Sequence, residues 1–374
     1  MGTSVVDTKR LSVTRVCLLV AFVLLAFLYC LRQVHDSSSG AGLFLRQVGS
    51  TRTRGYLGVA VRKHRVPPTT TDSISAGIKW FQDNGGYLHP NVVFKPRPSN
   101  PNVRGAFATG VVRQGAKIAT VPLHLFLTSK KALGLLVSEL NENSLHRDGS
   151  AHVTTPSEVM KALGLAAGST KQRTKQRQLA VLALYLAVHR DNTDNFFYPY
   201  FQMMPKDCQN WICWPQGRLE KVFRKDALDN LDQTRGIYVG MAKRLGIDPA
   251  EFLVQISIAQ SRYWNDPTAA KEHTMIPIVD MFNHPEKGSG QLLSFRTNQF
   301  QGARLNQRSE GKEGDELFES YGPKNSAQLL ETYGFRFNYN AHDTCTKLRR
   351  DFTDDYLANN VVLLNGERCP VSAT

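Results

Sequence analysis

The hydrophobic pattern of this chain changes its period twice, and that change limits the folds the chain can adopt. Between Val92 and Thr128, short β-rich runs alternate with turns such as Arg113-Gln114-Gly115. Helical periodicity takes over from about residue 130 to residue 262, and short runs typical of strands return after Met275. A set of strands that is interrupted in sequence by helices predicts an α+β fold with small β-sheets.

Two helices are predicted from clear local signals. Asp72–Phe81 is expected to form a short helix that begins with Asp72 or Ser73 as N-cap and stops at Asn84-Gly85-Gly86. Leu179–Arg190, with the sequence LAVLALYLAVHR, is apolar on nearly every side. A helix of that composition is expected to be buried rather than to lie at the surface.

The last third of the chain contains three predicted strands and one predicted helix. Ile276–Phe282 is an apolar run that is expected to form a strand, and Gln291–Phe295 has the pattern of a weak strand. Glu316–Tyr321 is expected to form the third strand. Ser326 then caps a helix that ends at Gly334, since serine favours the N-cap and glycine the position after the last turn.

The N-terminal segment has the pattern of a targeting or anchoring sequence. Val16–Leu31 contains no charged residue, and basic residues precede it. No small-residue cleavage site directly follows this run, which favours an uncut, single-pass membrane anchor over residues 1–35. Cleavage within the later segment Ser37–Gly42 stays open, so a signal peptide is the alternative.

The segment 36–71 is rich in hydroxyl and arginine side chains and holds no acidic residue after Asp36. This composition is typical of a basic disordered stalk, or of a transit-like segment placed behind a signal sequence. The second case predicts a plastid or another organelle as the destination, reached after cleavage of a bipartite targeting sequence.

The net charge of +14 is concentrated near the N-terminus. Residues 1–71 hold ten Lys or Arg and two acidic residues, and so they carry +8 of this charge. The remaining +6 is ordinary for a soluble domain, and no nucleic-acid partner is therefore expected. With 374 residues, of which 41% are hydrophobic, the chain is long enough to bury a substantial core, and a monomer is expected.

The six cysteines are scattered and include no CxxC pair. This spacing predicts neither a zinc site nor a disulfide framework. Cys208 and Cys213 are close enough in sequence to pair in an oxidising lumen, but small buried thiols are the favoured interpretation. On that basis the body of the chain is expected to suit a reducing compartment.

Three short motifs carry side chains able to do chemistry. Asp280, Asn283 and His284 place a carboxylate, an amide and an imidazole around one turn, which suits adenine or a metal, or satisfies the turn backbone. Tyr321 is a poor base, but its hydroxyl is able to orient a nucleophile. Arg104-Gly105 combines a guanidinium with a position that lets backbone approach a ligand. Each motif alone is more often structural.

The order of these motifs is far more specific than any one of them. The ordered blocks are WFQDNGGYLHP (80–90), RGAFATGVVRQGAKIATVP (104–122), FFYPYFQMMP (196–205), Arg262, IPIVDMFNH (276–284) and FESYGPKNSAQLLETYGF (318–335). Over about residues 75–335 this series resembles the SET-domain methyltransferases, in particular the branch of the plant Rubisco large-subunit methyltransferase.

The resemblance implies a SET fold of small β-sheets with a pseudoknot, in which the last segments thread beneath an earlier loop. The catalytic domain would span residues 72–340, with a mainly helical insertion at about 130–262, and an N-terminal apolar helix would precede it. Residues 341–374 would be a short remnant of the substrate-binding region. No cysteine-rich zinc lobe follows the domain, which makes a histone substrate less expected.

The resemblance also implies roles for individual residues around S-adenosylmethionine, without a metal. Tyr321 would be the catalytic tyrosine, and Arg262 would face the methionine carboxylate. The remaining cofactor-binding residues would be Arg104, Gly105 and Phe107, then Asp280, Asn283 and His284, with the last two holding adenine largely through backbone groups, and finally Tyr333 and Phe335 in the pocket wall. Phe282, Phe318 and Tyr333 are expected to line the channel for the acceptor side chain.

The function implied by the resemblance is N-methylation of a lysine on a non-histone protein. Protein histidine is the alternative acceptor, because an imidazole needs no deprotonation of an ammonium group. A catalytically inactive SET-like binding module and a membrane-tethered scaffold are the readings from other functional classes.

Overall fold

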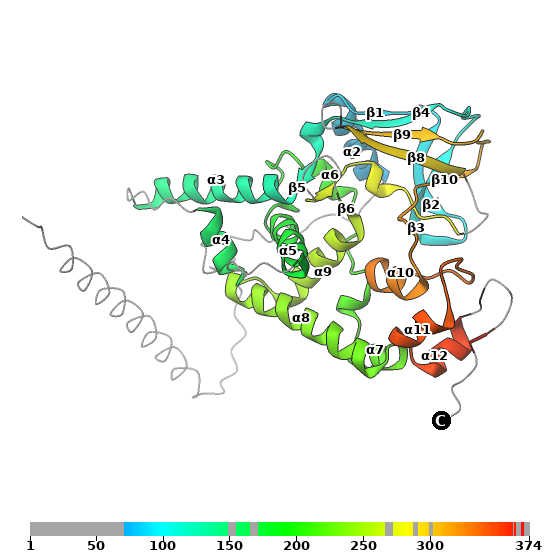
Figure 1. Ribbon diagram of the computed structural model, residues 1–374. Helices are drawn as coiled ribbons and strands as arrows, with labels where there is room; N and C mark the ends of the chain where they lie inside the picture. Colours follow the sequence, from blue (N-terminus) through cyan, green and yellow to red (C-terminus); the bar gives the residue numbers. More distant parts are fainter. Residues whose placement is uncertain are drawn as a thin grey trace, which may run out of the picture. The chain divides into compact units, whose positions relative to one another are not determined.

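The computed structural model describes residues 71–148, 155–164, 171–265, 272–286, 291–298, 302–361, 363, 368 and 369 (Figure 1). The anchor predicted for residues 1–35 and the stalk predicted for 36–71 lie outside these residues, except for Thr71. Among the helices that the structure describes, none is both long enough and apolar enough to span a bilayer.

The main sheet has seven strands that come from both ends of the sequence (Figure 1). Their order is β1-β4-β9-β8-β10-β3-β2, and each neighbouring pair is antiparallel except β8 and β10. The strands are β1 (Tyr87–Leu88), β2 (Val92–Arg97), β3 (Asn100–Ala108), β4 (Lys117–Val121), β8 (Gln291–Asn298), β9 (Gly302–Gln307) and β10 (Glu316–Phe318). The prediction of sheets interrupted by helices is therefore confirmed.

A second sheet of three short antiparallel strands has the order β5-β7-β6. These strands are β5 (Leu127–Thr128), β6 (Tyr263–Asn265) and β7 (His273–Met275). Strand β5 precedes the helical block and β6 follows it, so this sheet joins the two ends of the block.

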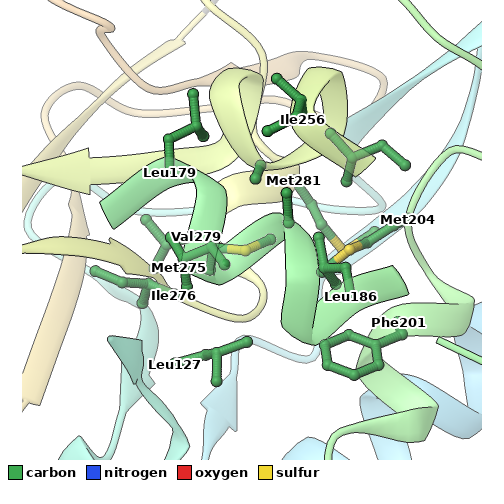
Figure 2. Packing of buried hydrophobic residues seen from close by; sticks show 14 of the residues in the cluster. Leu127, Leu179, Leu186, Phe201, Met204, Ile256, Met275, Ile276, Val279 and Met281 are labelled. Carbon is green, nitrogen blue, oxygen red and sulfur yellow. The ribbon is translucent and has the colours of Figure 1, made fainter. Parts of the chain in front are cut away.

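The helices between β5 and β6 are α3 (Ser129–Asp148), α4 (Pro156–Ala162), α5 (Lys171–His189), α6 (Tyr198–Gln202), α7 (Gln216–Val222), α8 (Lys225–Leu245) and α9 (Pro249–Arg262), with a 3₁₀ turn η2 (Trp211–Cys213). Helix α5 packs against α3 and α9, and its residues 179–187 are all buried, as predicted for a helix that is apolar on nearly every side. Figure 2 shows Leu179 and Leu186 of α5 within this core, together with Ile256 of α9.

Helix α2 (Thr71–Asp83) confirms the predicted first helix. At the other end of the chain lie α10 (Ser326–Tyr333), α11 (Cys345–Asp351) and α12 (Asp354–Asn360). The structure places the N-cap of α10 at Asn325 rather than at Ser326, since the Asn325 side chain and Gln328 form a reciprocal capping box. Gly334 ends α10 in the left-handed conformation, as predicted.

Two strand predictions need correction. Ile276–Phe282 is not a strand, because Ile278 has a φ of 69° and turns the chain into the 3₁₀ helix η3 (Val279–Met281). The strand predicted for Glu316–Tyr321 ends at Phe318. By contrast, the weak strand predicted at Gln291–Phe295 is the longer strand β8, which pairs with β10 at its start and with β9 from Leu293 to Asn298.

The cysteine prediction was wrong. Cys208 is bonded to Cys213, and Cys345 is bonded to Cys369. An interval of five residues does not by itself predict a bond, but the fold brings the two Cα atoms of the first pair to 6.1 Å. These bonds remove the basis for expecting a reducing compartment.

Candidate active site

A pocket lies where the end of α9, strand β6, the turn η3 and the segment after β10 meet. The residues that line it are Gln260, Ser261, Arg262, Tyr263, Trp264, Asn265, Asp280, Tyr321, Lys324, Thr332 and Tyr333. Local structure explains why these segments end here: Arg262 is the last residue of α9, and Ile278 turns the chain so that Asp280 lies on η3.

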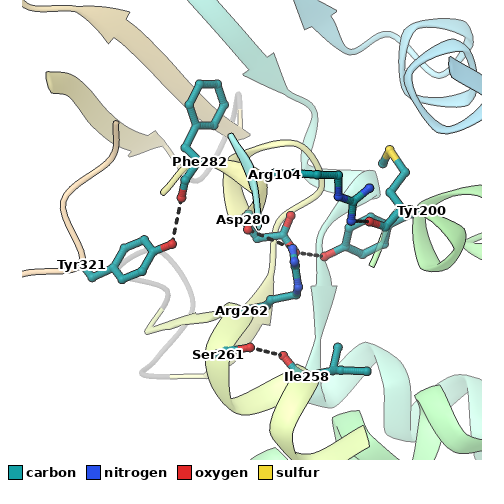
Figure 3. Close-up of polar contacts among 9 residues, drawn as sticks. Arg104, Tyr200, Ile258, Ser261, Arg262, Asp280, Phe282 and Tyr321 are labelled. Carbon is teal, nitrogen blue, oxygen red and sulfur yellow. Dashed lines mark hydrogen bonds and ion pairs between the residues drawn. The ribbon is translucent and has the colours of Figure 1, made fainter. Parts of the chain in front are cut away.

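The Asp280 side chain is completely buried and forms the centre of a polar network. One of its carboxylate oxygens lies 3.3 Å from Nη1 of Arg262, and the Tyr200 hydroxyl donates to the same oxygen at 2.6 Å (Figure 3). Desolvation raises the pKa of the Asp280 carboxyl, while Arg262 and the Tyr200 hydrogen bond oppose the rise. The short O–H···O distance is typical of a charge-assisted bond, which indicates an ionised carboxylate.

Arg104 brings a second guanidinium to this network (Figure 3). Its Nη2 donates to the backbone oxygen of Met203. Burial, with a contribution from Arg262, lowers the pKa of Arg104 to about 10, so the group stays charged at neutral pH. Two largely buried cations therefore lie near one buried carboxylate, and Arg262 is the one paired with it.

Several polar atoms of this network have no partner. They are Nη1 of Arg104, Nε of Arg262 and Oδ1 of Asp280, all of them buried. Buried donors without an acceptor are rare in folded proteins, and each asks for an explanation such as a ligand. The excess of positive charge and the free N–H groups suit a small anionic group such as a carboxylate.

Tyr321 closes the pocket from the segment after β10. Its hydroxyl donates to the backbone oxygen of Phe282 at 2.9 Å (Figure 3). A parallel bridge between Asn283 and Phe318 holds the two segments side by side and thereby sets this distance. Burial raises the pKa of Tyr321 above its ordinary range, so the phenol stays protonated and serves as a hydrogen-bond donor rather than as a base.

A ring of aromatic side chains extends from Tyr321. The centroid of the Tyr321 ring lies 5.1 Å from that of His284 and 4.5 Å from that of Tyr333. Phe335 and Phe337 complete the ring, because they link Tyr333 back to His284 at 6.0, 5.3 and 5.7 Å. These side chains form an aromatic wall on one side of the tyrosine, and Phe337 was not singled out from the sequence.

The sequence matches no family model and no curated protein. The structure is similar to the SET domain of LSMT bound to lysine and AdoHcy, with a TM-score of 0.51 and 16% identity over 72% of this chain and 58% of that one. It is also similar to Rubisco LSMT bound to AdoMet, with a TM-score of 0.51 and 15% identity over 72% and 57% of the respective chains. The chain has the SET fold. It spans less than three fifths of the length of those two structures.

The SET fold brings together some of the predicted site residues. Arg262, Asp280, Tyr321 and Tyr333 line the pocket, and Arg104 lies beside Asp280. Of the three residues expected to line the acceptor channel, Tyr333 lines this pocket, whereas the rings of Phe282 and Phe318 face Phe94 and Arg97.

Other predicted residues of the SET domain have structural contacts. Gly105 is packed under Glu316, where a Cβ would meet the carboxylate Oε1 at 2.3 Å. The Asn283 amide donates to that same oxygen at 2.9 Å and to the Arg104 backbone oxygen at 2.8 Å. Phe107 is buried on β3 beneath Lys95. The prediction that Gly105, Phe107 and Asn283 bind a cofactor, in part through backbone groups, stays a prediction.

His284 is placed to hold the Tyr321 segment. Its Nδ1 accepts a hydrogen bond from the Tyr321 backbone N–H at 3.2 Å. Desolvation lowers the pKa of His284 to about 4, so the imidazole is neutral at neutral pH. It therefore orients the tyrosine as a neutral acceptor.

Sequence reasoning missed Tyr200, which reaches Asp280 from the helical block. Tyr200 lies on the short helix α6 and is completely buried, with its ring stacked on that of Trp80. A fully buried tyrosine needs a partner for its hydroxyl, and the aromatic block 196–205 was the available signal. Within the described ranges, no three His, Cys, Asp or Glu side chains come together as a metal site.

Proposed function

We propose that this chain is an S-adenosylmethionine-dependent protein methyltransferase that methylates lysine on a non-histone protein. The observation that carries the proposal is the pocket in which a protonated tyrosine, Tyr321, shares the lining with the Arg262–Asp280 pair. The similarity to the fold of LSMT, a protein whose structures hold lysine and AdoMet, supports the choice of cofactor and acceptor.

The residues present fit such a cofactor at its anionic end. The free N–H groups of Arg104 and Arg262 provide donors for the methionine carboxylate. Asp280 stays bound to Arg262, so it limits the positive charge of the site without neutralising both guanidiniums. When bound, the cofactor supplies an electrophilic methyl group on a sulfonium.

The chain's own task is then to deliver a neutral amine in line with the methyl group and to exclude water. The aromatic residues Tyr263, Trp264 and Tyr333 line the pocket. An ammonium group that enters a pocket with aromatic walls loses hydration, which lowers its pKa and favours the neutral amine. The Tyr321 hydroxyl oxygen lies 2.9 Å from the Phe282 backbone oxygen, and this pair of oxygens is placed to orient the amine.

A labelled-methyl assay tests the proposal. The full chain is incubated with isotope-labelled S-adenosylmethionine and a cell lysate, and mass spectrometry locates the label. Methyllysine on proteins other than histones is the expected result. Methylhistidine would instead show that the acceptor is histidine, the alternative. Cofactor binding without transfer would indicate an inactive binding module, and the absence of binding would contradict the proposal altogether.

The matched variants are Tyr321→Phe in the pocket and Tyr339→Phe at the surface, where the Tyr339 side chain is 48% exposed. Transfer should be lost with the first variant and kept with the second. Equal transfer by both would show that the label reaches its acceptor by another route.

We also propose, from sequence pattern alone, that residues 1–35 anchor the protein in a membrane, with delivery to a plastid or another organelle as the alternative. The two disulfides favour an orientation in which the SET domain faces an oxidising compartment. Fractionation of cells that express the tagged full chain separates the two cases, since an anchored chain stays with membranes at its full mass.

A further inference from the structure

A loop closed by the Cys208–Cys213 disulfide lies against the pocket wall. Between its two cysteines, Asn210 is completely buried, whereas both cysteines are partly exposed. Asn210 also begins the 3₁₀ turn η2, because its side-chain oxygen accepts from the Ile212 N–H at 3.4 Å. The disulfide thus holds a buried amide in one position on a loop that solvent reaches.

The Asn210 amide bridges two elements of the pocket. Its Nδ2 donates to the Gln260 side-chain oxygen at 3.0 Å and to the Thr332 backbone oxygen at 3.0 Å. Both acceptors line the pocket, one at the end of α9 and one at the end of α10. Each is close in sequence to a site residue, since Arg262 follows Gln260 by two positions and Tyr333 follows Thr332.

The backbone of the same loop also supports α10 and α9. A Cβ at Gly334 would lie 1.8 Å from the Gln209 backbone oxygen, so the end of α10 packs directly on the loop. The Gln209 N–H donates to the Ser257 hydroxyl on α9 at 3.2 Å. Movement of the loop would therefore release both pocket walls together.

We propose that Asn210 is a positioning residue for methyl transfer, and that the Cys208–Cys213 disulfide makes it redox-sensitive. The inference rests on the proposed function. A dithiol reductant breaks the S–S bond: the two sulfurs take up two electrons and two protons to give two thiols, and the reductant closes to its own disulfide. The freed loop no longer holds Asn210 against Gln260 and Thr332, and the pocket loosens.

The second disulfide is a matched control. Cys345–Cys369 joins the start of α11 to the C-terminal segment, and neither cysteine lines the pocket. It spans 24 positions, against five for Cys208–Cys213, so its loss is expected to lower overall stability more. A purely structural role for disulfides thus predicts the larger effect at Cys345–Cys369, and the proposal predicts the larger pocket effect at Cys208–Cys213.

The experiment compares the oxidised full chain with the same protein after dithiothreitol, and with the double variants C208S/C213S and C345S/C369S. Hydrogen exchange of the amides in 256–262 and 328–334 reports the pocket walls, and calorimetry reports S-adenosylmethionine affinity. Reduction and C208S/C213S should each raise exchange in both segments and weaken binding about tenfold, which corresponds to about 1.4 kcal/mol. C345S/C369S should lower Tm but leave both readouts unchanged.

Further arms keep the test decisive. Dithiothreitol should add no further change to C208S/C213S, and reoxidation of the wild type should restore its affinity. Asn210→Asp removes the amide donor while the disulfide stays closed, and it should reproduce the faster exchange. This variant tests the proposal even if C208S/C213S does not fold. Unchanged exchange on reduction, or an equal pocket effect from C345S/C369S, would overturn the inference. If the oxidised wild type binds no cofactor, the proposed function fails, and hydrogen exchange still decides the role of the loop.

Discussion

Two carboxylates lie near the site, Glu316 largely buried and Asp280 completely buried, and they differ in how fully their oxygens are hydrogen-bonded. Glu316 on β10 has a partner for each oxygen: the Arg97 Nε donates to Oε2 at 2.9 Å and the Asn283 amide to Oε1 at 2.9 Å. Asp280 also has an arginine partner, but one of its oxygens and one nitrogen of Arg262 have none.

The difference separates a structural network from a site. Satisfied polar groups fix the position of the segments that they join, and Glu316 joins β2 to the chain around Asn283. A network left incomplete costs folding free energy, which a protein tolerates where a ligand completes it. Substitutions in the first network should therefore change stability, and substitutions beside the second should change binding or turnover.

The largest effect is expected at Tyr321, which faces the incomplete network across the pocket. Tyr321→Phe removes the hydroxyl that orients the acceptor, and turnover should fall by about 100-fold or more. Cofactor affinity should stay within a few fold, because the proposed donors to the cofactor's carboxylate are Arg104 and Arg262 rather than Tyr321. Single-turnover kinetics and calorimetry measure the two quantities, and lost affinity with normal residual turnover would refute the assignment.

Glu316→Ala should give the largest loss of stability. It removes the acceptor of the Arg97 Nε and one of the two acceptors of the Asn283 amide, and the free energy of unfolding should fall by about 2–3 kcal/mol. Urea unfolding measures the change. A variant with wild-type stability but no cofactor binding would place Glu316 in the site and would erase the distinction between the two networks.

Arg262→Gln and Arg97→Gln form a matched pair, since each arginine contacts one of the two carboxylates. The Arg262 variant should weaken S-adenosylmethionine binding about tenfold, as expected for the loss of one charged hydrogen bond. The Arg97 variant should leave that affinity unchanged and lower stability. Calorimetry measures the cofactor affinity of both variants, and thermal unfolding measures their stability. Equal affinities in the two variants would contradict the distinction between the two networks.

Gly105→Ala should have a smaller effect on stability. The added Cβ would lie 2.3 Å from the Glu316 carboxylate, so the free energy of unfolding should fall by about 1–2 kcal/mol. The cost should shrink in a Glu316→Ala background, because the colliding atom is gone. Additive losses in the double variant would mean that Gly105 is required by something other than Glu316.

The last effect depends on pH and concerns Glu319, which is buried two residues before Tyr321. Desolvation raises the pKa of Glu319 from its ordinary 4.5 to about 8. The folded state therefore binds more protons than the unfolded state between these values, and stability should fall as pH rises from about 4.5 to about 8. Glu319→Gln should flatten this dependence, by a few degrees in Tm across the window. An identical pH profile for variant and wild type would exclude Glu319 as its source.

Much of the fold was predictable because it depends on local pattern. The burial of residues 179–187 follows from their apolar composition, and the end of α10 at Gly334 follows from glycine's ease in the left-handed conformation. The strand predicted at Ile276–Phe282 failed because an apolar run does not reveal its backbone path. The turn at Ile278, with a φ of 69°, lies in the core, where Ile278 is completely buried.

The sequence by itself determined the α+β class, the order of the motifs and the identity of Arg262, Asp280, Tyr321 and Tyr333 as pocket residues. Tertiary structure alone decided which polar groups meet. Tyr200 lies 80 positions from Asp280 and Asn210 lies 122 positions from Thr332, and no local periodicity encodes such contacts. The pairing of the cysteines has the same cause, since a disulfide requires two sulfurs to meet in space and the fold alone brings them together.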